Sequence, residues 1–137
     1  MKKSIILVLT MVIVAFALVS CKKYNLSPAT TYPGNGRKIR FQLYTNKDFS
    51  GETSVINFSL FIKNANRTLL DSALAPMQIK DIPDSAHKLI IEKTVTGKDN
   101  DDLAAGFVYE IQNVGVSWYI DTSKAGNGFK VVDYAFQ

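Results

Sequence analysis

The stretch "VINFSLFIKNANRTLL", residues 55–70, decides the fold class of this chain. Apolar side chains recur at every second position from Ile56 to Ile62, and only Phe61 makes the intervening positions less polar than expected. A period of two is typical of a strand with one buried face, because successive side chains of a strand point to opposite faces. The Asn-rich segment "KNANRT", residues 63–68, then predicts a hairpin turn.

Short strands are predicted on both sides of this stretch, with polar or Gly-containing turns between them. They span residues 39–44, 69–71, 77–79, 89–95, 107–111, 116–120 and 129–136. The turn "AGNG", residues 125–128, leads into the last strand, and a single helical turn is expected near residues 100–105. Seven or eight short strands at such intervals predict an all-β protein, a single antiparallel β-sandwich over residues 37–137.

The order of elements in residues 58–93 carries a resemblance to known folds. A strand, an Asn-rich turn, a short strand, the element "IKDIP" and another strand follow one another there. This order resembles the hairpin and crossover of transthyretin-like and immunoglobulin-like modules. The chain has one cysteine and therefore lacks the Cys…Trp…Cys pattern of antibody domains. The resemblance implies a sandwich of one of these two types and no particular activity, because such folds host many functions.

The N-terminus predicts export. Lys2 and Lys3 precede the run from residue 5 to residue 19, which is apolar except for Thr10. As a helix this run would be only about 22 Å long, whereas a bilayer core of about 30 Å requires roughly 20 apolar residues. A charged start, a short apolar run and a small residue at its end predict a cleaved, helical signal peptide over residues 1–20.

The end of that run indicates which kind of signal it is. Leu18-Val19-Ser20-Cys21 resembles the lipobox of bacterial lipoproteins. The resemblance implies cleavage between Ser20 and Cys21, a diacylglyceryl group on the Cys21 thiol and acylation of the new amine. It also explains a single cysteine in an exported chain, which otherwise calls for an explanation. The alternative is an ordinary signal peptide that leaves Cys21 as a free thiol.

Residues 21–36 are predicted to be the lipidated cysteine and a flexible tether. Pro and Gly are frequent there, and residues 22–36 would have an end-to-end distance of roughly 21 Å as a coil. Two or more acyl chains hold a protein stably on a membrane, and Lys22 and Lys23 add attraction to an anionic surface. The chain resembles lipoproteins of the Bacteroidota. The aspartate that retains many lipoproteins of enteric bacteria in the inner membrane is absent at position 22, and this analogy favours the outer membrane. In Bacteroidota an acidic run after the cysteine resembles a surface-export signal, and because "CKKYNLSP" contains no acid, the periplasmic face is favoured over the cell surface.

Charge and composition exclude several functions. Removal of the signal leaves 14 basic and 12 acidic residues, a net charge of +2, and the only dense basic group in the domain is residues 37–40. Nucleic acid is therefore not an expected partner. With one histidine and one cysteine in the chain, a zinc site is not expected, and no cofactor is predicted. The segment "KDNDDL", residues 98–103, lacks the glycine and distal glutamate of an EF-hand, so a solvated turn is favoured over a calcium site.

No catalytic site is predicted. Asp84, Ser85 and His87 lie close together in the chain, but they are expected to form the turn that follows Pro83. The chain has no G-x-S-x-G motif. Paired carboxylates of a small hydrolase stay open as an alternative.

Two triplets, Asp71-Ser72-Ala73 and Asp84-Ser85-Ala86, resemble the Asp-Ser/Thr-apolar signal for O-glycosylation in exported Bacteroidota proteins. The resemblance implies candidate glycan acceptors at Ser72 and Ser85.

Aromatic residues of the last third provide a candidate ligand platform, formed by Trp118, Tyr119 and Tyr134. The alternative is that Trp118 and Ile120, which share a face of one strand, pack in the core. The chain is thus predicted to be a membrane-anchored, non-catalytic binding or assembly module. An exposed edge strand or apolar patch would favour a protein partner in the envelope. Coplanar exposed aromatic rings would favour a glycan, and converging acids would favour a hydrolase.

Overall fold

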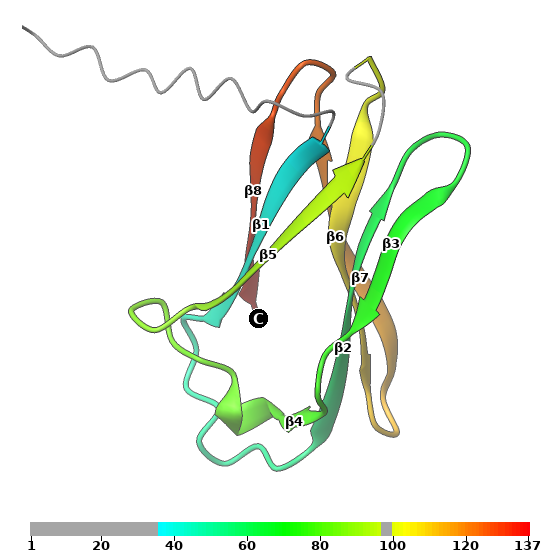
Figure 1. Ribbon diagram of the computed structural model, residues 1–137. Coiled ribbons are helices and arrows are strands. Elements are labelled where there is room, and N and C mark those ends of the chain that lie inside the picture. Colours follow the sequence, from blue (N-terminus) through cyan, green and yellow to red (C-terminus); the bar gives the residue numbers. More distant parts are fainter. Residues whose placement is uncertain (1–35, 97–99) are drawn as a thin grey trace, which may run out of the picture.

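The computed structural model describes residues 36–96 and 100–137, so the predicted signal peptide, Cys21 and nearly all of the tether lie outside the described residues. Eight strands and one 3-10 turn form this part of the chain (Figure 1). They are β1 (Gly36–Thr45), β2 (Val55–Lys63), β3 (Thr68–Ala73), β4 (Met77–Gln78), the turn η1 (Ile79–Asp81), β5 (Leu89–Thr96), β6 (Leu103–Ile111), β7 (Gly115–Ser123) and β8 (Phe129–Phe136).

The strands form two sheets, which confirms the predicted all-β sandwich. Sheet A has the order β5-β1-β8, and sheet B has the order β3-β2-β6-β7, with β4 also pairing with β2. All pairs are antiparallel except β1 and β8, which run parallel from Lys38 opposite Phe129 to Thr45 opposite Phe136. The expectation of a wholly antiparallel sandwich is therefore corrected for this pair. Parallel neighbours need a long crossover, and here the whole intervening chain provides it.

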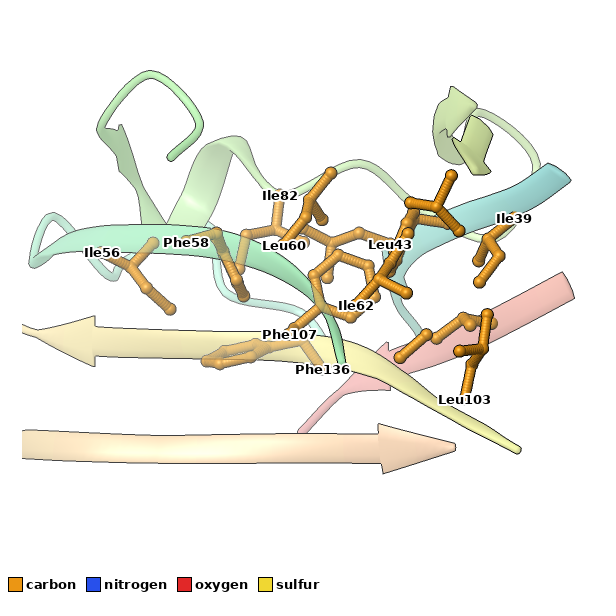
Figure 2. Packing of buried hydrophobic residues seen from close by; sticks show 14 of the residues in the cluster. Ile39, Leu43, Ile56, Phe58, Leu60, Ile62, Ile82, Leu103, Phe107 and Phe136 are labelled. Atoms are coloured by element: carbon orange, nitrogen blue, oxygen red, sulfur yellow. The ribbon is translucent and has the colours of Figure 1, made fainter. Parts of the chain in front are cut away.

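The core lies between the two sheets because every second side chain of the central strands points inward. Phe107 of β6 lies at its centre, with ring centroids 5.6 Å from Phe41 of β1 and 6.2 Å from Phe58 of β2. Figure 2 shows inward-facing side chains from both sheets meeting there. The buried apolar side chains are Ile39, Phe41, Leu43, Ile56, Phe58, Leu60, Ile62, Ile79, Ile82, Val95, Leu103, Ala105, Phe107, Val132 and Phe136.

Two predicted elements differ in the structure. Residues 100–105 form no helical turn, because β6 already begins at Leu103 and buries Leu103 and Ala105 in the core. Ile79, expected in a strand, lies in the 3-10 turn η1, where its side chain is buried and its N–H donates to the Ser54 carbonyl.

Polar side chains stabilise the predicted turns. The Asn64 Oδ1 accepts hydrogen bonds from the backbone N–H groups of Asn66 and Arg67, at 3.0 and 2.8 Å. This interaction confirms the Asn-rich hairpin turn between β2 and β3. The turn before β8 has Gly126 at φ +79°, a conformation that glycine adopts at no steric cost.

Candidate functional site

The outer faces of the two sheets differ in character. On sheet A the Glu92 carboxylate lies 2.6 Å from Lys38 Nζ and 2.6 Å from Arg40 Nη2. Hydrogen bonds from Lys38, and then from Arg40, lower the pKa of Glu92. On the same sheet Lys88 pairs with Asp133 at 2.9 Å. Charges paired in this way are typical of a solvated surface.

The outer face of sheet B contains a contiguous group of exposed apolar side chains. Val116, Trp118 and Ile120 of β7 are 60%, 66% and 46% exposed. Val108 of β6 lies opposite Trp118 in the ladder, and Phe61 of β2 lies on the same face beyond it. We call these five residues the Trp118 patch. Contiguous exposed apolar surface marks interaction sites in soluble domains.

Polar side chains border part of the patch around an open hollow of about 420 Å³. The Lys63 Nζ lies 5.6 Å from the centroid of the Phe61 ring. An apolar centre with a polar rim is the usual anatomy of a protein interface. The residues that line the hollow are Phe61, Lys63, Thr68, Asp71, Val108, Trp118 and Ile120.

Register and charge together turn Trp118 outward. β7 pairs with β6 without a register shift from Gly115 to Ser123, so its even-numbered side chains share the outer face. Asp121, on the opposite face, forms an ion pair of 2.7 Å with Lys130 of β8. Trp118 therefore lies on the solvent side and does not pack in the core.

Tyr119 and Tyr134 lie on the other side of sheet B from Trp118. Their rings stack with centroids 4.8 Å apart, and the Tyr134 hydroxyl donates to the Tyr109 hydroxyl at 3.1 Å. Burial raises the pKa of both Tyr119 and Tyr134. The three residues of the predicted ligand platform thus form no common surface. The structure brings Tyr119 and Tyr134 together with Tyr109 and leaves Trp118 on the opposite face.

Phe61 and Val108 complete the Trp118 patch, although the sequence did not single them out as site residues. The sequence contains one sign of an apolar outer face, which is Phe61 at a position of the β2 segment where a polar residue is expected. Val108 lies between Phe107 and Tyr109, and three large side chains in a row do not show which face of the strand is exposed.

The two candidate acceptors for O-glycosylation have different surroundings. Ser85 is exposed in the turn that precedes β5. Ser72 lies within β3, is half-buried and faces Leu60 across the ladder. The geometry favours Ser85 as an acceptor, because a glycan at Ser72 would have to leave the inner face of the sheet.

The acids named in the sequence stabilise loops. Asp84 Oδ1 accepts hydrogen bonds from the N–H groups of Ala86 and His87 and lies 2.9 Å from His87 Nδ1. The hydrogen bond with the His87 side chain lowers the pKa of Asp84. Asp102 binds Lys124 at 2.8 Å and the Ala125 N–H at 2.9 Å. Within residues 36–96 and 100–137 no three His, Cys, Asp or Glu side chains are grouped to hold a metal ion.

Membrane attachment involves Ser20 and Cys21, which lie outside the described residues. In the described part of the chain, no helix has the length and apolarity needed to cross a bilayer. Comparisons of the chain with models of known protein families, with curated proteins and with solved structures find no match.

Proposed function

We propose that this chain is a lipid-anchored envelope protein that docks onto a protein partner through the Trp118 patch, without catalysis. The observation that carries the proposal is the asymmetry of the sandwich. Sheet A has ion pairs among its exposed apolar side chains Ile90 and Phe129, whereas the exposed apolar side chains of sheet B lie together in the Trp118 patch. The sequence supports the anchor, because the segment that ends at Cys21 resembles a lipobox. The absence of acidic residues directly after Cys21 supports attachment to the periplasmic face of the outer membrane.

Trp118 is the residue expected to dominate binding. Interface hot spots are enriched in Trp and usually lose about 2 kcal/mol or more on truncation to alanine. That loss corresponds to roughly 30-fold weaker binding. Val108 and Ile120 flank the ring and would exclude water around it.

The anchor and tether would favour this docking. Lipidation of Cys21 confines the domain to one membrane surface, and the tether allows it to stand off by roughly 21 Å. A partner in the same membrane therefore meets the patch at a raised effective concentration.

A glycan is the second candidate ligand, since Lys63 and Asp71 line the same open hollow as Trp118. An exposed indole can stack on a sugar ring while polar groups bind its hydroxyls. The flanking surface is aliphatic, however, and Tyr119 and Tyr134 stack on the other side of the sheet. A protein surface is the better fit.

The test is photo-cross-linking in the native envelope, with a photoreactive residue at Val108 or at Ile90. Ile90 is the matched control because it is 54% exposed and apolar but lies on sheet A. We expect discrete protein adducts from position 108 only, and their loss in Trp118→Ala. Equal adducts from both positions, or polysaccharide adducts from position 108, would contradict docking onto a protein.

A further inference from the structure

Strand β7 forms one edge of sheet B and pairs only with β6 among the described strands. It is nine residues long, from Gly115 to Ser123, and runs without a register shift. The far side of its backbone therefore presents a row of N–H and C=O groups in the plane of the sheet. Such an edge is a template for another strand.

The other three edge strands have features that discourage pairing with a further strand. β3 has six residues and a register shift in its ladder with β2. β5 has Glu92 and Lys93 in its middle, and β8 has Lys130 and Asp133. Charges, short length and bulges are the usual protection of sheet edges.

β7 is nine residues long, has no register shift with β6 and contains one charged residue. It contains no Lys, Arg or Pro, and its single charge, Asp121, is paired with Lys130 at 2.7 Å. Its outer side chains Val116, Trp118 and Ile120 are exposed. We expect an edge strand of this length and composition to pair with another strand in the functional protein.

We propose that the strand covering β7 is β7 of a second copy of this chain, in antiparallel pairing about a twofold axis at Tyr119. This inference concerns the edge of sheet B and does not depend on the docking of a partner onto its face. The two copies of sheet B would join at β7 into one sheet with the continuous order β3-β2-β6-β7-β7-β6-β2-β3, with β4 of each copy still paired with β2.

The sequence of β7 matches itself in this register. A twofold axis perpendicular to the sheet keeps both outer faces on one side, so even-numbered residues meet even-numbered residues. Trp118 then lies opposite Ile120 of the second copy, and Val116 lies opposite Thr122. Asp121 lies opposite Ser117, so no like charges meet across the strands.

Pairing at the edge would leave the outer face of sheet B exposed in both copies and would join the two faces into one larger surface. The Trp118 patch of one copy would continue into the patch of the other across the twofold axis. The apolar surface offered to a partner would thereby double.

Disulfide trapping of the full-length chain in its own membrane tests the pairing. Two differently tagged versions are produced together, one with Val116→Cys and the other with Thr122→Cys, and treated with a mild thiol oxidant. Opposed residues of an antiparallel pair have Cα atoms about 4.5 to 5.5 Å apart, within the range of about 4.4 to 6.8 Å that a disulfide spans. We expect a cross-linked dimer that carries both tags.

Three controls define the background. The chain without added cysteines measures any contribution of Cys21. Two tagged Ile90→Cys versions measure chance collision at an exposed edge of sheet A. Two tagged Val116→Cys versions test the register, because those positions would lie far apart. The Val116→Cys and Thr122→Cys pair is expected to exceed all three several-fold, and a yield no higher than any of them would overturn the pairing.

A second comparison separates pairing from docking. Adding Ile120→Lys places a charge on the edge strand and is expected to lower the yield of cross-linked dimer several-fold, whereas Ile90→Lys leaves it unchanged. Adducts from position 108 to other proteins are scored separately. If those adducts form while the disulfide dimer does not, the second copy is excluded and the docking proposal stands. The reverse result excludes docking and leaves the pairing intact.

Discussion

Replacing Gly106 by alanine is expected to destabilise the domain strongly. Gly106 lies in β6 opposite Ile120 of β7, and an added Cβ would lie 1.8 Å from the Tyr119 carbonyl oxygen and 2.9 Å from its carbonyl carbon. Ordinary contacts begin at 3.4 Å, so the strands would have to separate locally by about 1.6 Å. Rotation of a side chain cannot relieve the clash, because both nearby atoms belong to the backbone.

The loss of stability is estimated from the hydrogen bonds between β6 and β7. Separation by that distance breaks the hydrogen bonds on either side of Gly106, each worth about 0.5 to 1.5 kcal/mol. Overpacking of a tight site typically costs about 1 to 3 kcal/mol. We expect Gly106→Ala to lower the free energy of unfolding by about 3 kcal/mol. A typical domain, stable by about 5 to 15 kcal/mol, would remain folded.

Equilibrium urea unfolding of the chain from residue 22 onward, followed by circular dichroism, measures this loss. Gly51→Ala is the matched control, since no atom lies within 4 Å of its added Cβ and its φ is not positive. That change is expected to be neutral or to stabilise by about 0.4 to 1 kcal/mol. If Gly106→Ala were as stable as Gly51→Ala, the close approach of β6 and β7 described here would be wrong.

Four further predictions concern the core, the charges, the patch and the anchor. Phe107→Ala is expected to lower the free energy of unfolding by about 3 to 5 kcal/mol in the same assay, because its ring is buried between the sheets; a loss below 1 kcal/mol would contradict its central place. The pKa of Glu92 is lowered in the folded state. Ionised Glu92 therefore stabilises the fold fully well above pH 4.5, and this contribution is lost as the pH falls below that value. Glu92→Gln should therefore make unfolding less sensitive to acid, and an unchanged pH profile would refute the contribution of its ion pairs. Trp118 is the only tryptophan, so the fluorescence of the purified chain should be red-shifted and readily quenched by acrylamide, whereas a blue-shifted, protected emission would place the ring in the core. Cys21→Ala is expected to release the protein from the membrane fraction, and unchanged partitioning would refute lipidation.

The strands were predictable because their signal is local. Every second side chain from Ile56 to Ile62 is apolar, and β2 contains that run. The turn at Asn64 was equally predictable, because its side chain accepts a hydrogen bond from the N–H group of Asn66, only two residues later. The start of β6 was missed, because Ala104, Ala105 and Gly106 are poor strand formers on their own. They form a strand there because β2 and β7 pair with them on both sides.

Partners distant in the chain could not be predicted. Alternation in β1 and β8 marks each as a strand but does not show that the first and last strands are parallel neighbours. The resemblance to transthyretin-like or immunoglobulin-like modules stays a prediction.

The candidate site was only partly predictable, because both faces of β7 contain large side chains. Trp118 and Ile120 occupy one face, and Tyr119 and Asp121 the other. Taken alone, the pattern favours the face with the aspartate as the exposed one. The structure turns that face inward because Lys130 pairs with Asp121 and Tyr134 stacks on Tyr119. Both contacts are made by residues of β8, so the sequence of β7 alone cannot predict them.

Oxidative footprinting of Trp118 in the native envelope tests the central proposal most directly, because this chain has no other tryptophan. The indole should be oxidised rapidly in the purified protein and protected in intact envelopes, where a partner covers the patch. Equal oxidation in both preparations would contradict docking through this face.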